Sequence, residues 1–179
     1  MNSGITVGDK EFSISDIQKP VDEILEARKS VDTSQMQLAS GADLIRNQAQ
    51  FAIISVLLDQ IASDMKINFT SADIATRRTE IVAQVGGEQG LPAALVSSNL
   101  ATSNLEPYIK VRLIIDKLTS DLIALGVSPE QASEEVSRLI VEAAKKLGVE
   151  VNPKYGKWNA ANASIESGDI TDGAVTPAP

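Results

Sequence analysis

The stretch from Gly41 to Lys66, GADLIRNQAQFAIISVLLDQIASDMK, decides the fold. Its apolar residues recur at helical spacing, and its central part, from Phe51 to Leu58, is apolar nearly all round. A helix of this kind is normally enclosed by neighbouring elements. The pattern therefore predicts a long helix over 41–66 at the centre of the domain, with the other elements packed around it.

The segments on either side of this central helix also have helical periodicity. Ser15, Ser128 and the pair Gly86-Gly87 mark helix ends, because Ser is a frequent N-cap and Gly a frequent C-terminal stop. Pro20 suggests that the first helix begins later than its cap. The predicted helices span 16–31, 72–85, 91–96, 105–125 and 129–147. The inward stripe predicted for 105–125 consists of Tyr108, Val111, Ile115, Leu118, Leu122 and Leu125.

The two ends of the chain predict a small β element. Alternating apolar residues at 5–7 and 12–14 flank a Gly-Asp turn, and 149–151 looks like a third strand. Two short strands alone are marginal in water, so we expect 149–151 to pair with the N-terminal strands and to bury Trp158. The predicted fold is mainly α, with about six helices. The domain is expected over 1–158, followed by a disordered acidic tail over 159–179.

Composition excludes several classes of function. The chain of 179 residues has no Cys and no His. Thiol nucleophiles, Ser-His-Asp catalysis and nearly all zinc, haem and iron–sulfur sites are therefore absent. The net charge is −8, without a run of basic residues, which argues against nucleic acid as a partner. We expect neither enzymatic activity nor a cofactor or metal.

Three groups of residues could be read as sites, and each also has a structural interpretation. Asp59, Asp64 and Asp73 could form a carboxylate cluster, but their spacing favours solvated helix faces. The segment 86–90, GGEQG, lacks the Lys and hydroxyl of a phosphate loop and reads as a connection between helices. Tyr155 and Trp158 could form an aromatic ligand patch, although closure of the core is the favoured interpretation.

The order of elements resembles the amino-terminal domain of the SurA-like and PrsA-like exported chaperones. The resemblance rests on LIRNQAQ and LLDQIA in the central helix, on TSADI, on NLEPYIKVRLIIDKL and on the closing VEVNPKYGKW. It covers roughly residues 4–158, and the final NPKYGKW is typical of members from Gram-positive bacteria, especially actinobacteria. Many members insert a parvulin-type prolyl isomerase domain before the last helix. Here only 125–129 lies between helices, so the resemblance implies the chaperone module alone.

The resemblance implies an ATP-independent holdase that binds unfolded or exported polypeptides through an apolar groove. The alternative is a scaffolding module with one dedicated protein partner, or a dimer that exchanges terminal segments. The resemblance also implies an extracytoplasmic location, in the cell envelope or secreted, with membrane attachment only through a lipid anchor on a removed leader. The chain itself carries no signal peptide pattern. The sequence does not identify the residues that would bind a peptide.

Overall fold

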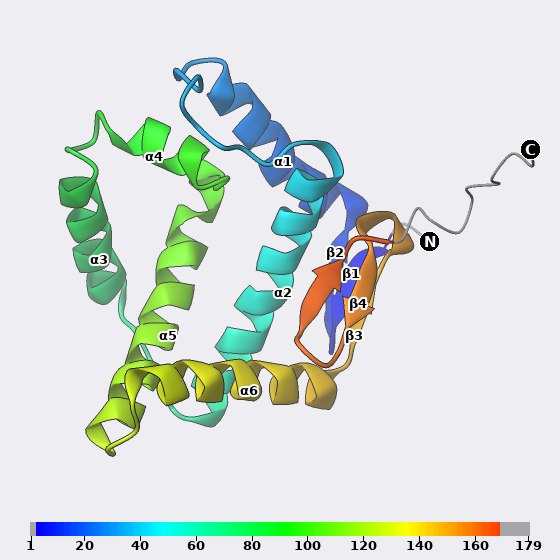
Figure 1. Ribbon diagram of the computed structural model, residues 1–179, viewed down its shortest axis with the longest axis vertical. Helices are drawn as coiled ribbons and strands as arrows, with labels where there is room; N and C mark the ends of the chain where they lie inside the picture. The colour runs from blue at the N-terminus through cyan, green and yellow to red at the C-terminus, as the bar shows by residue number, and fades with distance from the viewer. Residues whose placement is uncertain (1–2, 169–179) are drawn as a thin grey trace, which may run out of the picture.

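The computed structural model describes residues 3–168. These residues form six α-helices and a small β element, which confirms the predicted fold class (Figure 1). The helices are α1 (Ile14–Arg28), α2 (Gly41–Asp64), α3 (Ser71–Gln84), α4 (Leu91–Ser97), α5 (Leu105–Ala124) and α6 (Pro129–Leu147), with 3₁₀ turns η1 (Thr102–Asn104) and η2 (Pro153–Tyr155). The strands are β1 (Ser3–Val7), β2 (Lys10–Ser13), β3 (Val149–Val151), β4 (Lys157–Asn159) and β5 (Ser164–Glu166).

Helix α2 lies at the centre of the molecule, as predicted (Figure 1). Its C-terminal half meets α5 and α6, and its N-terminal end lies beside α1. The largest core cluster includes Ile53, Leu57 and Leu58 of α2, which are completely buried, together with Ile114 of α5 and Val136 of α6. No helix within residues 3–168 is both long and apolar enough to cross a membrane.

The ends of the chain meet in one antiparallel sheet with the strand order β2-β1-β3. Ile5 is opposite Val151, and Val7 is opposite Val149. The side-chain amide of Asn152 adds a bond of 3.0 Å to the carbonyl of Ser3. The predicted closure of the domain by its two ends is therefore confirmed. Burial of the closing aromatic residues is unequal, because Tyr155 is 3% exposed whereas Trp158 is only partly buried.

The predicted disordered tail begins too early. Residues 157–166 form a hairpin in which β4 pairs with β5, and Trp158 lies opposite Ile165. Ala163 and Ile165 are buried in the main core cluster. The segment was read as a tail because its apolar residues are few and small, yet two of them contribute to the core. Residues 169–179 lie outside the described residues.

The predicted start of the first helix is also wrong. Ser13, and not Ser15, is the N-cap, in a capping box where Asp16 N donates to Ser13 Oγ and Asp16 accepts from Ser13 N. The helix therefore begins at Ile14 and ends at Arg28, with Pro20 inside it. The capping box satisfies two backbone donors at once, so the helix begins before the proline.

The inward stripe predicted for α5 is rotated in the structure. Val111 and Leu118 are buried as expected, but Tyr108 is 36% exposed and Leu125 is 83% exposed. Helix α5 packs against α3 on one side and against α2 and α6 on others, which moves its buried face. Leu105, Ile109 and Ile114 are buried in place of the outer members of the predicted stripe.

Candidate functional site: a groove along the central helix

A groove of about 340 Å³ runs beside the middle of α2, residues 47–54, facing the connection between α4 and α5. We call it the α2 groove. Its apolar lining residues are Phe51, Ile54, Leu100 and Tyr108. Its polar lining residues are Asn47, Gln48, Gln50, Ser98 and Asn99.

Helix geometry brings the α2 residues of the groove onto one side. Asn47, Phe51 and Ile54 are spaced by four and three residues, so their side chains lie above one another on the same face. Phe51 and Ile54 are half-buried. Tyr108, from the first turns of α5, faces the same hollow and remains 36% exposed. The groove therefore presents two aromatic rings and aliphatic surface to solvent.

Partly buried hydrogen bonds fix the position of Asn99, which lines the groove. Arg28 Nη2 donates to the carbonyl of Ala39 at 2.6 Å and to Asn99 Oδ1 at 2.9 Å. Gln48, which is 4% exposed, donates from Nε2 to the carbonyl of Asn99 at 3.0 Å. These bonds attach the α4–α5 connection to α1 and α2, so the groove is formed before any ligand binds.

A second hollow, of about 480 Å³, lies between α1, α2 and the start of α5. It shares Gln48 and Phe51 with the α2 groove, and Pro20 and Pro107 add apolar surface to it. The ring of Phe51 therefore stands between two hollows. The charged side chains of Asp16, Lys19 and Glu23 also line this second hollow.

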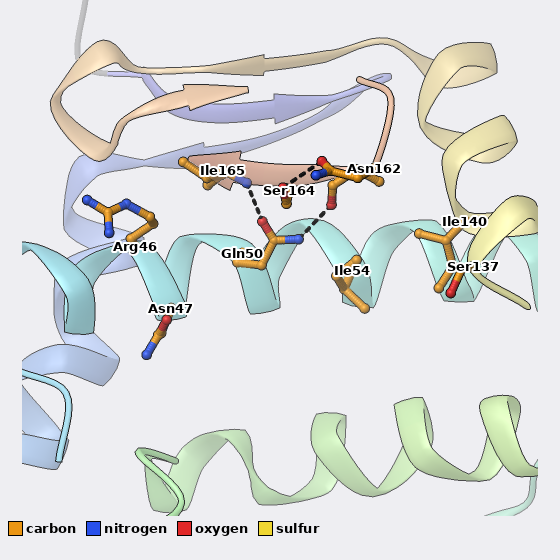
Figure 2. A pocket seen from close by; sticks show the side chains of 10 residues that line it. Arg46, Asn47, Gln50, Ile54, Ser137, Ile140, Asn162, Ser164 and Ile165 are labelled. Carbon is orange, nitrogen blue, oxygen red and sulfur yellow. Dashed lines mark hydrogen bonds between the residues drawn. The ribbon is translucent and has the colours of Figure 1, made fainter. Parts of the chain in front are cut away.

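On the other side of α2, a third hollow of about 320 Å³ lies against β5 and α6 (Figure 2). There the Gln50 amide makes two bonds to the hairpin backbone. Nε2 donates to the carbonyl of Ala163 at 2.8 Å, and Oε1 accepts from Ile165 N at 2.8 Å. Asn47, one turn before Gln50, also lines this hollow, and Figure 2 shows its side chain pointing away from β5. The amides of Asn47 and Gln50 therefore lie on neighbouring parts of the helix surface but have different surroundings.

No charged side chain lines the α2 groove. Carboxylates with a lowered pKa lie elsewhere, as in the Asp16 and Asp73 caps, where hydrogen bonds from Ser13 and Thr70 stabilise the charged form. Burial raises the pKa of Tyr155, outside the groove. An uncharged, half-open apolar groove suits the binding of neutral apolar groups better than proton transfer.

The three aspartates considered as a cluster do not come together. Asp59 pairs with Lys110 at 3.0 Å, and Asp64 pairs with Lys146 at 3.5 Å. Asp73 belongs to the capping box of α3. Over residues 3–168, no three His, Cys, Asp or Glu side chains lie where they could share a metal ion.

The Gly-rich segment ends α3, as its structural interpretation predicts. Gly86 and Gly87 have φ of 87° and 98°, and Gly87 N donates to the carbonyl of Val82 at 2.8 Å. This is the bond of a Schellman turn, which requires a residue with positive φ after the helix. Glu88 then pairs with Arg78 of α3. The polar groups of Gly87 and Glu88 in this loop therefore bond to α3.

The aromatic pair also has its structural role. Tyr155 is buried in the main core cluster, and Trp158 packs against that cluster. The exposed ring is instead that of Tyr108, which the sequence placed in the core. The one signal that could have indicated the groove is the excess of apolar residues around α2, since a small domain has few elements with which to cover every side of such a helix.

No family model, curated protein or solved structure matches this chain.

Proposed function

We propose that this chain is a non-enzymatic, ATP-independent holdase that binds apolar segments of unfolded polypeptides in the α2 groove. The observation that carries the proposal is a preformed apolar groove without a charged lining, in which Tyr108 is 36% exposed and Phe51 is half-buried. The resemblance to the amino-terminal domain of SurA-like and PrsA-like chaperones supports it. That resemblance also leads us to propose an extracytoplasmic site of action.

The physical chemistry of the groove fits weak and broad binding. Burial of apolar surface contributes about 25 cal/mol per Å², before the costs of ordering the bound chain are subtracted. A volume of about 340 Å³ is near the lower end of the range for small-molecule sites, so it accepts a few side chains at a time. The second hollow, on the other side of Phe51 from the α2 groove, adds further positions for neighbouring side chains of the same segment.

The test is suppression of aggregation for several unrelated denatured proteins, followed by light scattering. The intact chain should suppress aggregation of most of them. Phe51→Ser and Tyr108→Ser should lose much of this activity. Leu125→Ser is the matched control, because Leu125 is 83% exposed and lies outside the groove, so it removes comparable apolar surface. Circular dichroism verifies that each variant is folded.

Two results would contradict the proposal. Equal activity of Phe51→Ser and the intact chain, with a loss in Leu125→Ser, would move binding away from the groove. Suppression limited to a single client would instead favour the scaffolding alternative, in which one dedicated partner occupies the groove. Activity should also be nearly unchanged between low and high salt, because only interactions between charges are strongly screened.

A further inference from the structure

Helix α2 already holds one backbone segment of its own chain, at the point where Ala163, a turn residue with a φ of 53°, leads into the extended strand β5. Gln50 does this with a single amide, donating to the carbonyl of Ala163 and accepting from the N–H of Ile165 (Figure 2). The two backbone groups flank Ser164. A carbonyl and the N–H two residues later point to the same side of an extended chain, so one side-chain amide can satisfy both. Both bonds are made to backbone atoms, so they do not depend on the side chain of Ser164.

The α2 groove, on the neighbouring face of the helix, contains four amide side chains, and three of them are occupied. Gln48 donates to the carbonyl of Asn99, and Gln50 is bonded to the hairpin. Asn99 Oδ1 accepts from Arg28 Nη2 and from Ala39 N. Asn47, whose side chain is exposed to solvent, is the only one that makes no hydrogen bond within the part of the chain that the structure describes.

The position of Asn47 makes its free amide relevant to a ligand. It lies one helical turn before Phe51 on the groove face, and it points away from β5 (Figure 2). A ligand that enters the groove loses water from its own polar groups, and an unpaired peptide group buried in this way costs free energy. A neutral donor and acceptor beside Phe51 and Ile54 would compensate a peptide group, which is also neutral and has both functions.

We propose that Asn47 binds the backbone of an extended polypeptide segment in the α2 groove, in the same bidentate manner in which Gln50 binds β5. The amide nitrogen donates to a carbonyl of the segment, and the amide oxygen accepts from the N–H two residues later. Side chains on either side of this point then contact Phe51, Ile54 and Tyr108. The inference rests on the proposed function and names Asn47 as the residue that binds the backbone of the bound segment. It accounts for affinity that depends on an extended backbone more than on a particular sequence.

The experiment uses a fluorescein-labelled decapeptide of alternating Leu and Ser, with a series of copies that each carry one N-methylated peptide bond. Binding to the full chain is measured by fluorescence polarisation. N-methylation removes one N–H donor and leaves the side chains unchanged. We expect one or two positions at which N-methylation weakens binding about tenfold, the scale of a lost, partly buried hydrogen bond.

The variants Asn47→Ala and Asn47→Leu should bind the unmethylated decapeptide about tenfold more weakly, and N-methylation should no longer matter in either. Asn47→Leu keeps apolar volume in the groove, so it separates loss of the amide from loss of contact. Asn68→Ala, which removes an exposed Asn outside the groove, is the matched control and should behave like the intact chain.

Unchanged affinity in Asn47→Leu, or the same sensitivity to N-methylation in Asn47→Ala as in the intact chain, would overturn the role of Asn47 and leave the proposed function in place. If the decapeptide and the denatured clients both fail to bind the intact chain, the proposed function itself fails, and this inference falls with it. If clients bind the intact chain but the decapeptide does not, recognition requires more than an extended apolar segment, and the inference is again wrong.

Discussion

Two faces of α2 carry apolar side chains but have different surroundings. On the core face, Leu57, Leu58 and Ile61 are buried in the main core cluster. On the groove face, Phe51 and Ile54 are only half-buried, because the α2 groove lies beside them. The comparison teaches that an apolar helix in a small domain can provide the core on one face and leave an apolar groove on another.

The largest expected effect is on stability, and it separates the core face of α2 from its groove face. Leu57→Ala should lower the free energy of unfolding by about 4 kcal/mol, because it opens a cavity in a completely buried cluster. Ile54→Ala should lower it by about 1 kcal/mol, because part of that side chain already faces solvent and the site can relax. Urea denaturation followed by circular dichroism measures both.

Binding of clients should change in the opposite order, with a larger loss in Ile54→Ala than in folded Leu57→Ala. Equal destabilisation by the two substitutions would show that the groove face of α2 is as enclosed as its core face, and the distinction between core and groove would not hold.

The hairpin of β4 and β5 covers α2 beside the groove face, at Gln50. Ile165 is 7% exposed, and Ile165→Ala should cost about 2–3 kcal/mol, which corresponds to a fall of roughly 4–12 °C in melting temperature for a chain of this size. A chain that ends at residue 162 should fall further, because Gln50 then loses both backbone partners. Thermal melts of these two variants and of Asn162→Ala, a neighbouring exposed residue, provide the measurement. A truncated chain as stable as the parent would mean that the hairpin contributes nothing to the core.

The smallest expected effect concerns acid. The carboxyls of Asp16 and Asp73 have pKa values lowered in the folded state, by bonds from Ser13 and Thr70. A folded pKa below the unfolded one gives stability that is present above the unfolded value and is lost as pH falls through the folded value. Stability should therefore decline below about pH 4, where α1 and α3 lose their caps.

This loss should spare α2, whose N-cap Ser40 makes no side-chain bond. The double variant Asp16→Asn, Asp73→Asn should show a flatter profile of unfolding midpoint against pH between 2 and 5. An unchanged profile in this variant would assign the acid sensitivity to other carboxyls.

Much of the fold could be predicted from the sequence, because its signals are local. Ser128-Pro129 marks the start of α6, and Gly86 and Gly148 follow helix ends, as the sequence indicated. Pairing of 149–151 with the N-terminal strands followed from the need of short strands for partners. These inferences depend on a few adjacent residues and on general rules for backbone groups.

The groove could not be predicted, because it depends on how α5 and the connection from α4 to α5 pack beside α2. The periodicity of α5 placed Tyr108 inward, and only packing on several sides rotated its buried face. The hairpin was missed for a related reason. Ala163 and Ile165 are isolated among small and polar residues, and their burial depends on Gln50, which is more than a hundred positions away in the chain.

The pairing of β1 with β3 has a consequence for the order in which the domain folds. The sheet requires the pairing of Ile5 with Val151, and the contact between α2 and the hairpin requires the bond between Gln50 and Ile165. In both pairs the second residue is more than a hundred positions later in the chain. Contacts between such distant positions slow folding, and a chain that emerges from its N-terminus exposes its apolar surfaces in the meantime. During synthesis the central helix is therefore uncovered on the side of β5 until nearly the whole chain has emerged. In that interval this polypeptide presents the same kind of apolar segment that we propose its finished groove binds.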